Sequence, residues 1–156
     1  MVIMKPELEN IWDIEQNDKT IWEILGLPSS NCYVNTEWER DLGYIYHEFF
    51  DSGISILFIN NKLDTIFFFM KEKDGFKKTD LSPFNFISIH DGIKKIEENK
   101  LYDKKEILNN GRNINYFINN IKINLTINTY NEIELLAIQQ TIVCIKSKIY
   151  SKPQPT

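Results

Sequence analysis

Apolar and polar residues alternate most clearly in residues 53–70, GISILFINNKLDTIFFFM. Side chains of a strand point alternately to its two faces, so this alternation is typical of strands with one buried face. Asn60-Asn61 interrupts the pattern, and Asn tolerates the positive φ values of a two-residue type I′ turn. The pattern therefore predicts an antiparallel hairpin of 54–59 with 63–70. The face predicted to be core carries Ile54, Ile56, Phe58, Leu63, Thr65, Phe67 and Phe69.

The opposite face of this predicted hairpin carries Phe68 and Met70. These two side chains are interpreted either as a second layer of core or as a partner-binding patch. A membrane-spanning helix needs about 20 consecutive apolar residues. Asn60-Asn61, Lys62 and Asp64 interrupt the apolar run well before that length, so no membrane span is expected.

Further strands are predicted at 43–50, at 133–138, and as a second hairpin of 114–118 with 121–128 around Asn119-Asn120. Helices are predicted near 7–16, at 19–25, and after the N-cap residue Ser88, where Ile89, Ile93 and Ile96 form a buried stripe. Residues 132–150 are ambiguous. The spacing of Leu135, Ile138, Ile142, Ile145 and Ile149 fits a helix, whereas their β-branched residues favour strands. A strand is preferred for 133–138, and the remainder is left open.

These elements predict an α+β fold: an antiparallel sheet of about five or six strands built from hairpins, with two or three helices packed on one face. A chain of 156 residues is expected to form one domain, here over 1–150. The polar, proline-containing end, 151–156, is expected to be a disordered tail.

Charge is distributed unevenly along the chain. The net charge is −4, which argues against a general nucleic-acid binder. Residues 1–51 contain eleven acidic and three basic residues, so the N-terminal third is acidic while the remainder is basic. Such an acidic segment is either a solvated face or a surface for a basic partner.

No catalytic signature is present in the sequence. The two histidines, His47 and His90, and the two cysteines, Cys32 and Cys144, show no metal-ligand spacing, and no phosphate-binding glycine loop occurs. We therefore expect no enzyme activity, no catalytic residues, no cofactor and no metal. The cysteines are expected to be reduced thiols. The N-terminus lacks the basic and apolar regions of a secretory signal, so a cytoplasmic location is expected.

The most suggestive cluster lies between the predicted helices and the predicted sheet. It places a tryptophan, the residue type most enriched at binding hot spots, among carboxylates. The alternative is that the tryptophan is core and the carboxylates belong to a solvated loop. The predicted partner-binding residues are Glu37, Trp38, Glu39, Asp41, Glu48 and Asp51.

Two segments carry a resemblance. A short helix ends at Leu25-Gly26-Leu27-Pro28, and an aromatic strand leads into Gly53-Ile54-Ser55-Ile56-Leu57-Phe58 before the alternating hairpin. This order, over residues 19–70, resembles small cytosolic immunity proteins of bacterial toxin systems, from bacteriocin, contact-dependent inhibition and polymorphic-toxin loci. The resemblance implies a stoichiometric inhibitor, expected to be a monomer, that binds a cognate toxin and blocks its active site or an essential surface.

The implied partner is a basic protein, such as a nuclease toxin, with no nucleic acid or membrane as partner. Two alternatives remain open. One is a secretion chaperone or adaptor, usually dimeric, that holds an effector segment in an apolar groove at Phe68 and Met70. The other is an enzyme of unknown chemistry.

Overall fold

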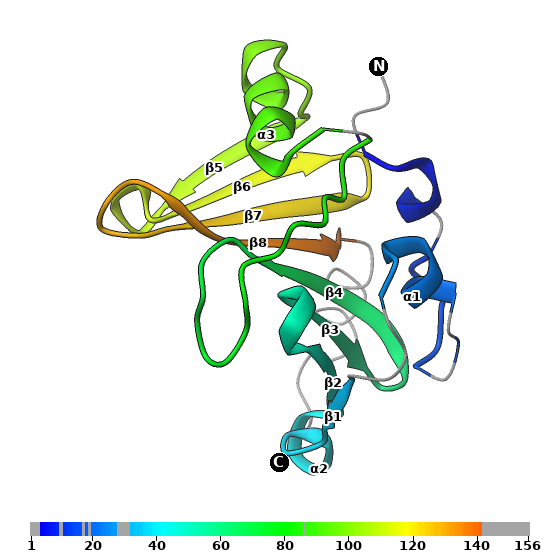
Figure 1. Cartoon of the computed structure of the whole chain (residues 1–156). Coiled ribbons are helices and arrows are strands. Elements are labelled where there is room, and N and C mark those ends of the chain that lie inside the picture. Colours follow the sequence, from blue (N-terminus) through cyan, green and yellow to red (C-terminus); the bar gives the residue numbers. More distant parts are fainter. Residues whose placement is uncertain are drawn as a thin grey trace, which may run out of the picture.

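The computed structural model describes residues 4–9, 11–16, 18, 20–27, 32–85 and 87–141. Within them, eight strands form one antiparallel sheet in the order β1-β2-β3-β4-β8-β7-β6-β5 (Figure 1). The strands are β1 (Tyr33–Asn35), β2 (Tyr44–Phe49), β3 (Ile54–Ile59), β4 (Lys62–Phe69), β5 (Lys104–Leu108), β6 (Asn113–Ile118), β7 (Ile121–Ile127) and β8 (Ile133–Gln140). Each half of the sheet is a four-stranded meander, and the pairing of β4 with β8 joins the two halves.

The helices of the described residues are short. They are η1 (Pro6–Glu9), α1 (Thr20–Leu25), α2 (Glu39–Leu42), η3 (Phe50–Ser52), α3 (Ile89–Glu98) and η4 (Asn109–Gly111). The caps of α1 and α3 confirm their predicted starts, because the backbone N–H of Thr20 donates to Oδ1 of Asp18 and that of Asp91 donates to Oγ of Ser88.

The predicted fold class is wrong in its balance of helix and strand. The structure is mostly β, with eight strands where five or six were expected, and among the described residues only α3 is a helix of seven or more residues. The two unpredicted strands, β1 and β5, are the sheet edges. Neither shows a clear apolar alternation, because β1 has three residues and β5 lies in the charged sequence KKEIL.

The helix predicted near 7–16 is also absent as such. Its start is the 3-10 turn η1, and its end runs beside β4. There the backbone N–H of Leu63 donates to the carbonyl of Ile14 at 2.9 Å, and Glu15 forms a bridge with Lys62. These tertiary bonds satisfy backbone groups that a continuous helix would have paired internally.

The predicted hairpin of β3 and β4 is confirmed, with φ values of 49° at Asn60 and 72° at Asn61. Its register contains a β-bulge, because Phe58 pairs with Leu63 and Leu57 pairs with Thr65. Asp64 is therefore an extra residue in β4. A bulge of one residue moves every later side chain of the strand to the other face.

The bulge corrects the predicted faces of β4. Phe68 and Met70, predicted to lie opposite the core, are buried in it with 0% and 5% of their surface exposed. Phe67, predicted to be core, is only half-buried and lies on the other face. Ile56 and Phe58, which precede the bulge, are buried as predicted.

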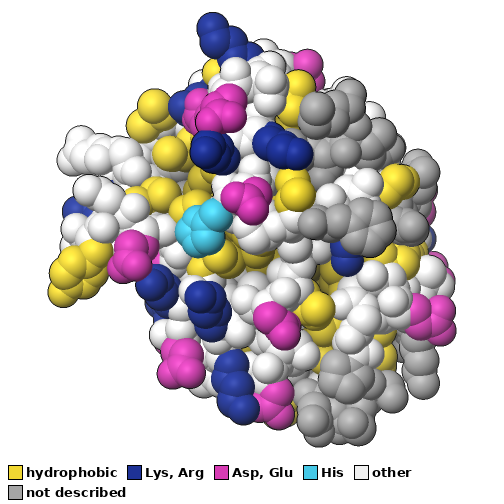
Figure 2. All heavy atoms as spheres, turned by 45° about the horizontal axis from the view of Figure 1, so that its top comes forward, with side chains coloured by type: hydrophobic (Ala, Val, Ile, Leu, Met, Phe, Trp, Pro, Cys, Tyr) yellow, Lys and Arg dark blue, Asp and Glu magenta, His cyan; other side chains and the backbone are white. Residues whose placement is uncertain are grey.

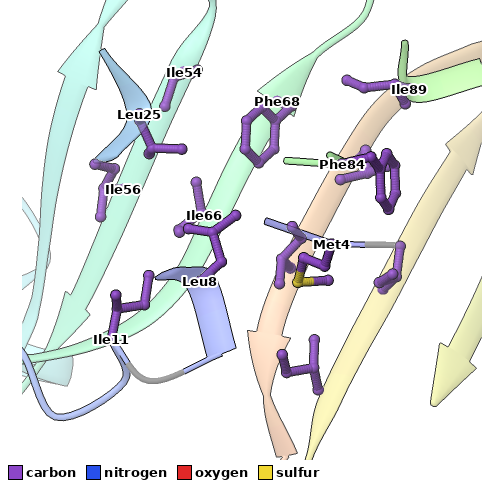
Figure 3. Packing of buried hydrophobic residues seen from close by; sticks show 14 of the residues in the cluster. Met4, Leu8, Ile11, Leu25, Ile54, Ile56, Ile66, Phe68, Phe84 and Ile89 are labelled. Carbon is purple, nitrogen blue, oxygen red and sulfur yellow. The ribbon is translucent and has the colours of Figure 1, made fainter. Parts of the chain in front are cut away.

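The N-terminal segment and α3 cover one face of the sheet. Figure 3 shows Leu25 next to Ile54 and Ile56, and Leu8 next to Ile66, all within one hydrophobic cluster. Phe84, from the segment between β4 and α3, and Ile89 of α3 extend this cluster. The apolar stripe of α3 is thus core, as predicted.

The second predicted hairpin is confirmed as β6 and β7, and β8 confirms the strand predicted at 133–138. The undecided residues 142–150 and the predicted tail 151–156 lie outside the described residues. None of the helices described is both long and apolar enough to cross a membrane.

Candidate functional site

The sheet face opposite the core carries a pocket of about 370 Å³. The alternation of side chains along β2, β3, β4 and β8 directs its lining residues away from the hydrophobic cluster. We call it the aromatic pocket. Its lining residues are Tyr46, Glu48, Phe50, Ser55, Phe67, Phe69, Lys73, Asp74, Phe76 and Leu135.

A stack of phenylalanine rings forms one wall of the aromatic pocket. Phe76 lies parallel to Phe69, with ring centroids 4.1 Å apart and planes 5° apart, and its centroid is 4.5 Å from that of Phe50. Phe76 reaches this position through a tight turn in which Asp74 and Gly75 both have positive φ. The backbone N–H of Phe76 donates to the carbonyl of Lys73 at 2.8 Å and closes the turn.

The chain after Phe76 is held close to Gly53. The N–H of Lys77 donates to the carbonyl of Phe50 at 2.8 Å, and the N–H of Thr79 donates to the carbonyl of Phe69 at 2.7 Å. Gly53 has φ +66°, and a Cβ there would lie 2.2 Å from the carbonyl oxygen of Lys77. The pocket wall therefore depends on a glycine at this position.

Glu48 places a carboxylate in the aromatic pocket. The side-chain amide of Asn35 donates to its Oε1 at 3.5 Å, and none of the ion pairs found among the described residues involves Glu48. Burial raises the pKa of Glu48, and the bond from Asn35 lowers it by a smaller amount. Lys73 also lines the pocket, but its Nζ lies 2.6 Å from Oε1 of Glu134. The carboxylate of Glu48 is therefore less completely paired than the ammonium group of Lys73.

A second, more polar hollow of about 270 Å³ adjoins the first, and Phe67 lines both. Its floor includes the bulge residue Asp64, which is 3% exposed. The carboxylate of Asp64 accepts hydrogen bonds from the hydroxyl of Thr65 at 2.6 Å and from the amide of Gln139 at 3.2 Å. The face is thus aromatic toward β2 and rich in amides toward β7.

The edge strand β1 borders the aromatic pocket. Tyr33 pairs with Glu48 and Asn35 pairs with Tyr46, so both β1 side chains lie on the pocket's face of the sheet. The ring of Tyr33 is 58% exposed, and its centroid lies 6.3 Å from that of Phe50. In Figure 1, α2 lies next to β1 at the end of the sheet. The N–H of Glu37, before α2, donates to Oδ1 of Asn35 at 3.0 Å.

Four of the six predicted partner-binding residues lie together around α2. Glu37, Trp38, Glu39 and Asp41 are all exposed, and Trp38 has 47% of its surface accessible. Its interpretation as a core residue is therefore wrong. Leu42, 52% exposed, adds an apolar side chain to this group. We call these five residues the acidic rim.

The other two predicted residues lie elsewhere. Glu48 is inside the aromatic pocket. Asp51 belongs to η3, at the opposite end of β2 from α2, and its Oδ1 lies 3.2 Å from Nζ of Lys77. The structure therefore splits the predicted cluster into a rim, a pocket residue and an ion pair.

The aromatic pocket itself was missed from the sequence. The Asp74-Gly75 turn signalled a change of direction, but nothing in the sequence showed that it returns Phe76 onto the sheet. The bulge at Asp64 reversed the predicted roles of the phenylalanines in β4. The apolar groove suggested at Phe68 and Met70 does not exist, since both residues are core.

His47, His90 and Cys32, which were singled out from the sequence, lie in different surroundings. His47 is 6% exposed, packs against Trp22 and Phe58, and has its pKa lowered by burial. His90 is exposed on α3. Burial raises the pKa of the Cys32 thiol to about 11, while Cys144 lies outside the described residues. No group of three or more His, Cys, Asp or Glu side chains that could hold a metal was found in the described part of the chain.

The face of the molecule in Figure 2 has basic and acidic side chains interspersed with apolar ones. No large area of a single sign dominates this view. Residues 37–42, by contrast, carry the three carboxylates of the acidic rim and a single cation, Arg40. Comparison of the chain with protein-family models, curated proteins and solved structures finds no match.

Proposed function

We propose that this protein is a stoichiometric inhibitor of the immunity-protein type, which binds a basic protein toxin in the cytoplasm and blocks it without chemistry of its own. The observation that supports this proposal best is the acidic rim. It presents an exposed tryptophan between the carboxylates of Glu37, Glu39 and Asp41. Tryptophan is among the residue types most enriched at binding hot spots.

The charge of the rim suits a basic partner. Carboxylates that project from the surface attract a cationic protein over several ångströms of solvent and raise the association rate. Nuclease domains are basic because they bind phosphate, so such a toxin is a suitable partner. The exposed side chains of Trp38 and Leu42 then supply the apolar contact that slows dissociation.

The proposed inhibitor needs only a stable scaffold and a projecting surface. α2 has four residues, none of them buried, and it follows an edge strand. Changes to these side chains therefore leave the hydrophobic cluster untouched. This separation of surface from core makes the rim suitable for clean mutational tests.

The partner to test is the product of the gene next to this one, measured by surface plasmon resonance at two salt concentrations. In the rim variant, Glu37, Glu39 and Asp41 are all replaced by Lys. Association should slow by at least about tenfold, and its salt dependence should weaken. The matched control makes the same charge change at three exposed acidic residues elsewhere, Asp13, Asp80 and Glu98.

Trp38→Ala tests the anchor separately. It removes contact area without changing charge, so it should speed dissociation and leave the association rate nearly unchanged. Each variant is first checked for the wild-type unfolding transition. Wild-type kinetics in both the rim variant and Trp38→Ala, with a partner that does bind, would contradict the proposed interface.

A further inference from the structure

We propose that the aromatic pocket accepts an arginine side chain of the protein partner, with its guanidinium against the carboxylate of Glu48 and beside the ring of Phe67. The inference deepens the proposed function, since the arginine would belong to the inhibited protein. It gives the pocket a definite occupant, a planar organic cation carried on an alkyl stem.

Charge is the first argument. Glu48 lies half-buried among aromatic side chains, and its one hydrogen bond from a described side chain, that of Asn35, is long at 3.5 Å. A carboxylate withdrawn from water gains most from a cation that can also donate hydrogen bonds. Of the other charged lining residues, Lys73 is paired with Glu134, and Asp74 adds a second carboxylate at the exposed turn.

The aromatic lining is the second argument. The rings of Tyr46, Phe50, Phe67, Phe69 and Phe76 all line the pocket. Aromatic rings attract cations through their negative faces, and the attraction strengthens where water is excluded. A purely apolar occupant would use these rings but would leave the carboxylate of Glu48 desolvated and unmatched.

The carboxylate and the aromatic lining of the pocket favour arginine over lysine. Its volume of about 370 Å³ is at the small end of the range for ligand pockets, enough for one long side chain. A guanidinium is flat, weakly hydrated and able to form two parallel hydrogen bonds with one carboxylate. An ammonium is strongly hydrated and gives up more hydration energy on entering an aromatic site.

The position of the pocket supports the same partner. Tyr33 and Asn35 of β1 face the pocket's side of the sheet, and Asn35 bonds both Glu48 and the backbone of Glu37. The pocket and the acidic rim are therefore linked through one edge strand. A basic protein captured by the rim could place an arginine in the pocket.

The test uses a small probe and needs no partner. N-acetyl-arginine N-methylamide is titrated into the full-length protein, and binding is followed by NMR of selectively labelled phenylalanine rings. The citrulline analogue has nearly the same shape without charge, and the lysine analogue has charge without the planar fork.

The variants are Glu48→Gln, which removes the charge, and Phe67→Leu, which removes a ring but keeps an apolar side chain. Glu98→Gln, at an exposed position of α3, is the matched control.

The arginine probe should shift the rings of Phe67 and Phe76, and it should bind at least about tenfold more tightly than the citrulline analogue. Glu48→Gln and Phe67→Leu should each weaken binding, and Glu98→Gln should not. Equal affinity for the citrulline analogue, unchanged affinity in Glu48→Gln, or no ring shifts would overturn the proposal. Equal affinity for the lysine analogue would overturn the assignment to arginine.

The result of the probe titration does not depend on whether the proposed function is correct. If the probe binds but the variants of the acidic rim capture the partner normally, the pocket stands and the proposed interface fails. If the rim variants lose the partner but the probe does not bind, the interface stands and the arginine pocket fails.

Discussion

The side chain of Asn35 on β1 reaches the carboxylate of Glu48 on β2, with Nδ2 and Oε1 3.5 Å apart. This contact crosses from the edge strand into the aromatic pocket. The other end of the same amide accepts the backbone N–H of Glu37. One residue thus contacts both the pocket carboxylate and the start of the acidic rim.

Replacing Asn35 by Ala should raise the pKa of Glu48 further. Burial already raises it above the ordinary value of 4.5, and the bond from Asn35 is the contribution that lowers it. The measurement is a pH titration of the glutamate side-chain carboxyl carbons by NMR. Glu132, whose pKa is lowered mainly by its bond from Lys71, is an internal reference and should titrate as in the wild type. An unchanged pKa of Glu48 would show that the 3.5 Å contact does not persist in solution.

Glu48→Gln should stabilise the fold near neutral pH, even though it removes the proposed ligand for arginine. The raised pKa means that folding disfavours the ionised carboxylate. The favourable contribution of Glu48 is therefore present below pH 4.5 and is lost as the pH rises through its folded pKa. Urea unfolding of both proteins at several pH values gives the difference. A destabilised Glu48→Gln at neutral pH would mean that Glu48 is a structural group.

Phe67 and Phe68 offer a direct comparison of the two sheet faces. Phe68 is fully buried in the core, so Phe68→Ala should cost about 3–5 kcal/mol of unfolding free energy. Phe67 is half-buried at the pocket, so Phe67→Ala should cost only about 1–2 kcal/mol. Both values come from urea denaturation. If Phe67→Ala cost more than Phe68→Ala, Asp64 would not be a bulge residue. The two side chains would then lie on the faces predicted from simple alternation.

Much of the sheet could be predicted from local patterns. The Asn60-Asn61 turn, both Asn-Asn hairpins and the start of α3 at Ser88 depend on neighbours in the sequence, and they were found. Edge strands β1 and β5 were missed, because an edge strand is set by the strand it pairs with. The bulge was missed because one extra residue leaves the apolar run unchanged while reversing its faces.

The candidate site was predictable only in part, for a related reason. The acidic rim lies within one short stretch of sequence, so its carboxylates could be grouped with Trp38 from the sequence, whereas the exposure of Trp38 was left open. The aromatic pocket gathers Phe50, Phe69 and Phe76 from separate segments. Their convergence depends on the backbone bonds that return residues 76–79 to the sheet, which no local pattern reports.

Gly53 and Gly26 have nearly the same φ, +66° and +67°, but different surroundings. A Cβ at Gly26 would meet nothing within 4 Å, so Gly26→Ala should cost only the left-handed backbone penalty of about 1–2 kcal/mol. At Gly53 it would lie 2.2 Å from the carbonyl oxygen of Lys77, which should add about 1–3 kcal/mol and displace the segment that holds Phe76. Thermal unfolding gives both costs, and equal costs would mean that this segment does not pack against Gly53.

His47 should make the fold sensitive to mild acid. It lies in the core against Phe58, and burial lowers its pKa below the ordinary value of 6.5, so the unfolded chain binds a proton more readily than the folded one. Stability is then lost as the pH falls from 6.5 toward the folded pKa.

His47→Phe keeps an aromatic ring without a titrating group and should flatten this part of the pH profile. His90→Gln, at an exposed site on α3, is the control for loss of an imidazole outside the core. A profile for His47→Phe that falls as steeply as the wild type between pH 6.5 and the onset of carboxylate protonation would show that the imidazole is not desolvated in the fold.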